Sequence, residues 1–179
     1  MNRKTLISLH LILAAFFAPI LIITGLSGGL YLIGEKGEVK KEIVYQGLIG
    51  EFNFTGKSKR QQVREFIRVN KLKQDFEYLK GDAKTFVTRP TSKQHLMFKV
   101  NKKQLIVTKR TPNFIASIVE LHKGHGSRAF KTFQKFMAIG LFLILVSGLF
   151  LGLTSPLLRN KTLLISGIGL LSFLFFAVF

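Results

Sequence analysis

Four histidines carry most of the chemistry that this 179-residue sequence can offer, because it contains no cysteine and only nine acidic residues. His10 lies in an otherwise uncharged apolar run, and His122 and His125 stand three residues apart shortly before a second run. An imidazole nitrogen is a good ligand for iron and other transition metals, so these three are candidate ligands. His95 has polar neighbours in a predicted strand, and we expect it to be a surface residue.

The absence of cysteine and the scattered acidic residues exclude several kinds of site. Without cysteine, the chain cannot form disulfides, iron–sulfur clusters, covalently attached c-type haem or a thiol nucleophile. The acids are scattered, and the stretch from His122 to His125 lacks the glutamate of a zinc-protease helix. We therefore expect no hydrolase and no metal site beyond a haem iron.

Three apolar runs, residues 6–33, 136–153 and 163–179, flank one polar block. Roughly 20 apolar residues of helix cross a bilayer core of about 30 Å. The sequence predicts an α-helical membrane protein with three transmembrane helices and a small α+β extramembrane domain inserted between the first two. The predicted segments are transmembrane helix 1 (1–34), the polar domain (35–128), transmembrane helix 2 (129–154), a loop (155–162) and transmembrane helix 3 (163–179).

The first apolar run is about twice the length of a signal-peptide core, and no small-x-small cleavage site follows it, so we expect it to be retained.

The short flanks of the apolar runs predict the orientation of the chain in the membrane. Arg3 and Lys4 precede the first run, and Arg159 and Lys161 lie between the second and third. Short basic flanks stay in the cytoplasm. We therefore predict a bacterial inner-membrane protein with a cytoplasmic N-terminus, a cytoplasmic loop at 155–162 and a periplasmic polar domain.

The chain is strongly basic, with a formal net charge of +18. Most of this charge lies in the polar block, and long domains cross the membrane largely regardless of their charge. Such a surface attracts anions, and we expect membrane lipid to be its main partner. An anionic ferric chelate or an acidic redox protein is a further candidate. Nucleic acid is not expected, because no basic–aromatic stacking motif is present.

Within the polar block, the pattern predicts one helix and an antiparallel meander. The helix covers residues 57–72, with Ser58 as its N-cap. The predicted strands are 76–80, 84–89, 94–100 and 104–109. A second helix is expected to start with Thr111 as N-cap and Pro112 as its first residue, and to run toward the histidine pair.

Glycines recur at helix-packing spacing in two of the apolar runs. Gly25 and Gly29 form one GxxxG pair, and Gly148 and Gly152 form another. Such pairs let helices approach closely in lipid. We predict that these glycines pack helices within one chain, or else between two chains.

His10 has two interpretations. It is either a neutral imidazole bonded to Ser8, Asn2 or a lipid headgroup, or an axial ligand of a b-type haem. His122 and His125 are either an interfacial pair that caps a helix end or ligands of a haem; they would share a face if that helix continues. About 30 Å of hydrocarbon separates His10 from this pair. One iron cannot span that distance, so a bis-histidine site requires a homodimer or a larger membrane complex.

The order of several short motifs resembles the PepSY-associated transmembrane family, which includes membrane ferric-siderophore reductases. The motifs are Ser8-Leu9-His10, Thr24-Gly25-Leu26-Ser27-Gly28, Val100-Asn101-Lys102-Lys103, Glu120-Leu121-His122-Lys123-Gly124-His125-Gly126 and Ser147-Gly148-Leu149. The resemblance covers about residues 5–155. It implies a periplasmic PepSY-like domain and haem b held by span histidines.

Carried over by motif, His10 and His122 match the span-opening Leu-His positions of that family, and His125 matches less closely. The third run contains no histidine, whereas larger members have at least one more span that opens with Leu-His. Two functions follow. One is a haem b electron-transfer component of the ferric or siderophore-iron reductase type. The other is a non-catalytic, membrane-anchored PepSY module that binds or regulates a partner protein.

Overall fold

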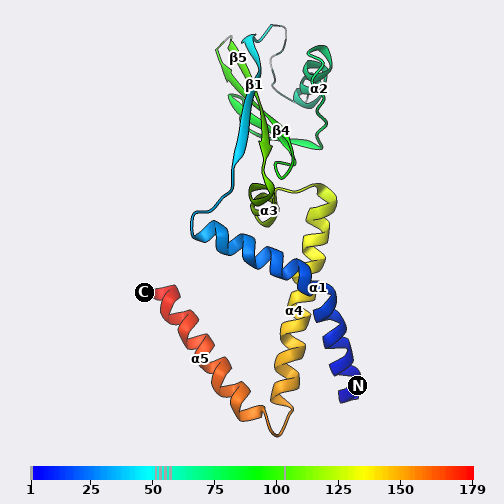
Figure 1. The fold of residues 1–179 in the computed structure, drawn as a ribbon, viewed down its shortest axis with the longest axis vertical. Helices are drawn as coiled ribbons and strands as arrows, with labels where there is room; N and C mark the ends of the chain where they lie inside the picture. The colour runs from blue at the N-terminus through cyan, green and yellow to red at the C-terminus, as the bar shows by residue number, and fades with distance from the viewer. Residues whose placement is uncertain (1, 51, 53, 55, 57, 103) are drawn as a thin grey trace. The chain divides into compact units, whose positions relative to one another are not determined.

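The computed structural model describes residues 2–50, 52, 54, 56, 58–102 and 104–179 of the chain. The described residues form five helices and five strands (Figure 1). In chain order these are α1 (Arg3–Leu32), β1 (Val39–Leu48), α2 (Lys59–Val69), β2 (Tyr78–Gly81), β3 (Thr85–Arg89), β4 (His95–Asn101), β5 (Gln104–Pro112), α3 (Phe114–His122), α4 (Arg128–Leu153) and α5 (Arg159–Val178).

The contacts divide the chain into two units. One consists of Met1–Leu21 with Lys135–Phe179, and the other of Ile22–Gln134. Helices α1, α4 and α5 have 30, 26 and 20 residues, and each is long and apolar enough to cross a membrane. The predicted class, a helical membrane protein that also contains an antiparallel sheet, is confirmed. The predicted segment boundaries stay predictions.

In the first unit, the N-terminal part of α1 packs against α4. The ring of Phe17 occupies the space where Gly140 would otherwise carry a side chain, and both residues are buried. Because glycine has no Cβ, the two backbones can approach closely here. This glycine was not among those predicted to pack helices.

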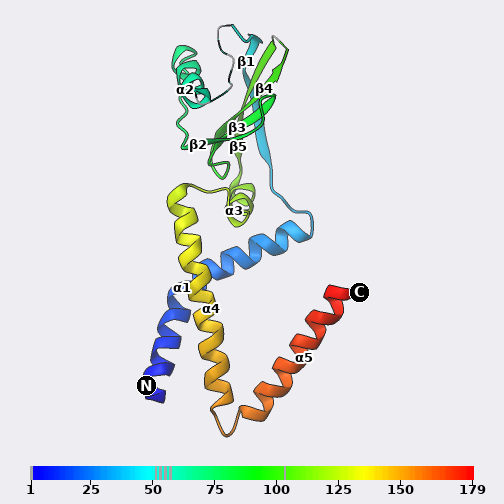
Figure 2. The ribbon, with the colours of Figure 1, turned by 180° about the vertical axis from the view of Figure 1, so that it is seen from behind.

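The second unit contains a five-stranded antiparallel sheet in the order β1-β5-β4-β3-β2 (Figure 2). The four predicted strands are present, with ends that differ by up to three residues. β1 was not predicted. It pairs with β5 from Val39 opposite Pro112 to Leu48 opposite Gln104, with an irregularity between Ile43 and Tyr45. That irregularity breaks the alternation of apolar and polar residues by which a strand is recognised in sequence.

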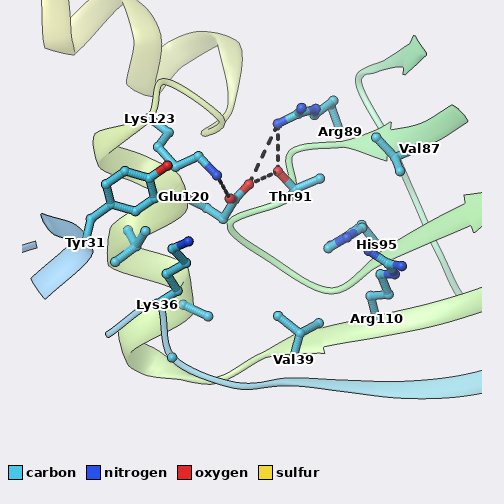
Figure 3. Close-up of a pocket in the computed structure, with 13 residues that line it drawn as sticks. Tyr31, Lys36, Val39, Val87, Arg89, Thr91, His95, Arg110, Glu120 and Lys123 are labelled. Atoms are coloured by element: carbon cyan, nitrogen blue, oxygen red, sulfur yellow. Dashed lines mark hydrogen bonds and ion pairs between the residues drawn. The ribbon is translucent and has the colours of Figure 1, made fainter. Parts of the chain in front are cut away.

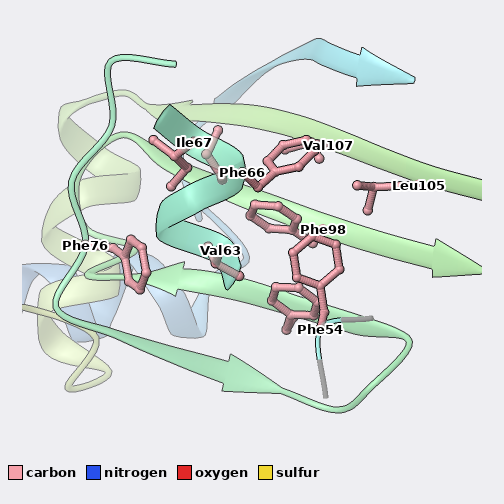
Figure 4. Close-up of a cluster of buried hydrophobic side chains, with 10 residues drawn as sticks. Phe54, Val63, Phe66, Ile67, Phe76, Phe98, Leu105 and Val107 are labelled. Atoms are coloured by element: carbon pink, nitrogen blue, oxygen red, sulfur yellow. The ribbon is translucent and has the colours of Figure 1, made fainter. Parts of the chain in front are cut away.

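Helix α2 covers one face of this sheet through a cluster of phenylalanines (Figure 4). Phe86 and Phe98 stack with their ring centroids 4.8 Å apart, and Phe66 of α2 meets Phe98 edge-on at 5.6 Å. Burying a side chain of this size stabilises the fold by roughly 1.5–3 kcal/mol. Ser58 takes the N-cap position of α2, as predicted, and the predicted helix start at residue 57 lies outside the described residues.

Alternation along the strands sends the other side chains to the opposite face. On β4, Leu96 and Phe98 belong to the phenylalanine core, so His95 and Met97 point away from it. His95 pairs in register with Arg110 of β5. This second face of the sheet therefore carries basic and polar side chains beside apolar ones such as Met97.

Helix α3 begins one residue after its N-cap, Asn113, whose side chain accepts a hydrogen bond from the Ala116 amide at 2.9 Å. The prediction of Thr111 as the N-cap is wrong, because β5 continues through Pro112 and the helix starts only at Phe114. The helix ends at His122, and Gly124 follows with a φ of +72°, a conformation that favours glycine.

Candidate functional site

His10 lies half-buried in α1, and its imidazole is held by a residue of α4. Its Nδ1 is 2.8 Å from the Oγ of Ser147, and that hydroxyl donates to the carbonyl of Ile144 at 3.1 Å. A serine hydroxyl has one proton to donate, so the Nδ1–H of His10 is the donor to Ser147. The assigned network therefore leaves the Nε2 lone pair of His10 without a hydrogen bond from the described residues. The serine that holds His10 is neither Ser8 nor any other neighbour in sequence.

The predicted packing glycines have different surroundings. A Cβ at Gly148 would lie 3.2 Å from Cε1 of His10, and one at Gly152 would lie within 3 Å of Thr162. A Cβ at Gly25 or Gly29 would meet no described atom within 4 Å. The packing role of these four glycines stays a prediction.

His122 lies against α1 rather than against another histidine. A Cβ at Gly28 would stand 3.0 Å from Cε1 of the His122 ring, so the absence of a side chain at Gly28 makes room for it. His122 is the last residue of α3, and the helix does not continue to His125. The two histidines therefore do not share a helix face.

His125 instead joins a network around Glu120 of α3. The carboxylate accepts hydrogen bonds from Thr91 at 2.5 Å, from Lys123 at 2.7 Å and from Nδ1 of His125 at 2.8 Å. Arg89 donates to Thr91 at 2.7 Å and lies 3.9 Å from the same carboxylate. Burial alone would raise the pKa of Glu120, but the hydrogen bonds outweigh it and lower that pKa to about 2.

This network forms one wall of a cavity of about 330 Å³ (Figure 3). The cavity lies on the sheet face opposite α2, between the strands, α3 and the end of α1. Its lining residues are Tyr31, Lys36, Gly37, Val39, Val87, Arg89, Thr91, His95, Arg110, Ala116, Val119, Glu120 and Lys123. Four of them are cationic and one is a carboxylate, so the cavity can receive an anion.

The prediction that His95 lies on the surface is wrong, because the residue is only 6% exposed within this cavity wall. Burial lowers the pKa of His95, and the charge of Arg110 adds to that shift, while the carbonyl of Lys93 opposes it. His95 is therefore neutral at pH 7. Its burial depends on strand pairing and on α3, which its own neighbours in sequence do not reveal.

Sequence reasoning also missed Arg89, Arg110 and Glu120 as a group. One signal was present: Glu120 is the single acidic residue of an otherwise apolar helix, between Val119 and Leu121. An isolated carboxylate on an apolar stripe must find a buried partner. Among the described residues, no cluster of three or more histidine, aspartate or glutamate side chains could bind a metal ion.

Comparison with known proteins gives one match. Residues 57–179 match the family model of PepSY_TM-like proteins, and this segment includes α2, four of the strands, α3 and both later spans. No curated protein and no solved structure matches the chain.

Proposed function

Because the chain belongs to the PepSY_TM-like family, we propose that this membrane protein binds haem b through His10 and His122 and carries electrons in the bacterial inner membrane. The hydrogen bond from Nδ1 of His10 to Ser147, 2.8 Å long, is the observation that supports this proposal. It leaves Nε2 as the free donor atom of an imidazole within an apolar helix.

The residues around His10 fit an axial haem ligand. A ligating histidine normally donates its second ring N–H to a neighbour, which fixes the tautomer and the ring orientation. Ser147 does this for His10, and Gly148 leaves the ring without a side chain against it. When bound, haem iron would supply one-electron redox chemistry. The chain's own part is to present Nε2, to hold the proton on Nδ1 and to keep water away with its apolar spans.

His122 is the proposed ligand on the periplasmic side. Its side chain is exposed, and Gly28 faces its ring. His125 stays a second candidate on this side, because its Nδ1 bonds to Glu120 at 2.8 Å and, as in His10, Nε2 is left to bind iron. The second ligand of each iron would come from a second copy of the chain or from another subunit. The acceptor would be a ferric chelate or a redox partner in the periplasm.

The second candidate is a membrane-anchored PepSY module that binds a ligand or partner without redox chemistry. The cation-lined cavity supports this function, because neither His10, His122 nor His125 is among its lining residues. The two functions make opposite predictions about haem content.

A reduced-minus-oxidised visible spectrum of the full-length protein in detergent, with haem quantified per chain, tests the proposal. Expression with ample haem should give a low-spin b-type signal and stoichiometric haem. His10→Ala and His122→Ala should each remove part of this haem and leave the folded state intact.

Wild-type protein without haem would overturn the electron-transfer function and leave the binding module. A His122→Ala protein with full haem content would show that the periplasmic ligand is wrongly assigned. Thermal unfolding of each variant separates loss of haem from loss of fold.

A further inference from the structure

We propose that the cavity lined by Arg89, Arg110 and Lys36 binds a phosphate group, presented by an acidic phospholipid headgroup or by a soluble phosphate. The proposal does not rest on haem binding. The haem spectrum and the experiment below can therefore fail independently.

The charges of the cavity are unbalanced. Its cations are Lys36, Arg89, Arg110 and Lys123, and Glu120 is its carboxylate. Lys123 already pairs with Glu120 at 2.7 Å. The other three cations have no second carboxylate in the cavity wall, and several converging cations favour a group with more than one anionic oxygen.

Two buried guanidinium nitrogens lack an acceptor. Arg89 has a side chain only 9% exposed, and its Nη1 reaches Thr91, but its buried Nε has no hydrogen-bond partner. The Nε of Arg110 is likewise buried and unpartnered. Buried polar groups in folded proteins nearly always have a hydrogen-bond partner, so we expect each of these two N–H groups to have an acceptor. A bound oxyanion would supply it.

A purely structural ion network accounts for only part of this arrangement. The contact of Arg89 with Glu120, at 3.9 Å, explains the position of one guanidinium end. This contact explains neither the missing hydrogen-bond partner of the Arg89 Nε nor the position of Arg110 beside His95. His95 adds no charge of its own, because burial lowers its pKa.

The mouth of the cavity lies near the end of a candidate span. Tyr31 is the penultimate residue of α1, and the ammonium groups of Lys36 and Lys123 lie 5.3 and 5.8 Å from its ring centroid. Tyrosine at a span end is typical of the headgroup level of the bilayer. In Figure 3, Lys36 lies across the hollow from His95 and Arg110. A lipid phosphate at the membrane surface would meet Lys36 first and the arginines deeper in.

Apolar side chains complete the lining. Val39, Val87 and Val119 contribute walls that cannot bond to water or to an anion. Such walls keep the dielectric low and strengthen the attraction between the arginines and an oxyanion.

Binding to the full-length protein in a non-ionic detergent tests the proposal. One arm titrates short-chain phosphatidylglycerol, with short-chain phosphatidylcholine as the zwitterionic comparison, and the other arm titrates inorganic phosphate. Arg110→Gln removes a half-buried cavity cation, and Lys36→Gln removes an exposed one. Arg68→Gln, on the far side of the domain in α2, is the charge-matched control, because its side chain is 78% exposed.

We expect saturable binding by the wild type, weakened about tenfold or more by Arg110→Gln and by Lys36→Gln and unchanged by Arg68→Gln. Preference for phosphatidylglycerol identifies a lipid headgroup, and preference for inorganic phosphate identifies a soluble ligand. No binding by the wild type in either arm, or equal weakening by all three variants, would overturn the proposal.

Discussion

Glu120 of α3 accepts a hydrogen bond from Thr91, which follows β3, and two more from Lys123 and His125, which follow α3. Its lowered pKa makes this network sensitive to acid. The carboxylate is stabilised when ionised, so its contribution is complete above the ordinary pKa of 4.5 and disappears as the pH falls through about 2. The lowering of the Glu120 pKa from 4.5 to about 2 corresponds to about 3 kcal/mol of stability, because one pKa unit is about 1.4 kcal/mol and the side chain, only 22% exposed, is weakly screened by solvent.

We predict that Glu120→Gln lowers the unfolding temperature of the full-length protein at pH 7. It should also reduce the loss of stability that the wild type shows between pH 4.5 and 2. Thermal unfolding in detergent across this pH range measures both effects. Glu65→Gln is the control, since that side chain is 46% exposed and pairs only with Arg68. Identical pH profiles for wild type and Glu120→Gln would contradict the prediction.

Ser147 fixes the ring of His10, and its removal tests that role separately from ligation. In Ser147→Ala the Nδ1–H loses its acceptor, so the imidazole can rotate and present Nε2 less well. We expect haem content to fall, or the visible bands to shift, while His10 is still present. Ser8→Ala is the matched control in the same unit, because Ser8 is exposed and lies two residues before His10 in α1. An unchanged haem spectrum in Ser147→Ala would remove this residue from the site.

At the scale of elements, α2 packs on the sheet through Val63, Phe66 and Ile67, of which Phe66 has the largest side chain. Phe66 is 1% exposed and contacts the rings of Phe98 and Tyr45. Its truncation leaves a cavity, so Phe66→Ala should destabilise the domain by about 3–5 kcal/mol. Val69→Ala, in the same helix at 60% exposure, should change little. Limited proteolysis within the domain measures the difference, and equal cleavage rates would contradict it.

How far the sequence predicts these elements depends on the range of the interactions. The spans and the central strands follow from hydrophobic runs and alternation, which are local properties. β1 carries Lys40, Lys41 and Glu42 at an edge and an irregularity further on, so its pairing with β5 has no local pattern. The candidate site shows the same contrast. His10 stands out in an apolar run, whereas the neighbourhood of Arg89, Arg110 and Glu120 exists only after three elements meet.

For the whole molecule, the proposed electron transfer to a periplasmic acceptor requires that the sheet domain face the periplasm. The amino-terminal flank contains Arg3 and Lys4, and the connection between α4 and α5 contains Arg159 and Lys161. Short basic flanks are retained in the cytoplasm, whereas the basic charge of a long domain has little influence. Both arguments predict that residues 35–128 lie outside the cytoplasm.

Cysteine accessibility can test this orientation directly, because the natural chain has no cysteine and every introduced thiol is unique. We predict that Lys99→Cys, exposed on β4, reacts with a membrane-impermeant maleimide in intact cells. Lys4→Cys and Lys161→Cys should react only after the inner membrane is permeabilised. Both are predicted on the cytoplasmic side, so each is a control for the other. Reaction of Lys161→Cys but not Lys99→Cys in intact cells would reverse the topology. The cation-lined cavity would then face cytoplasmic phosphates, and a periplasmic electron acceptor at His122 would be excluded.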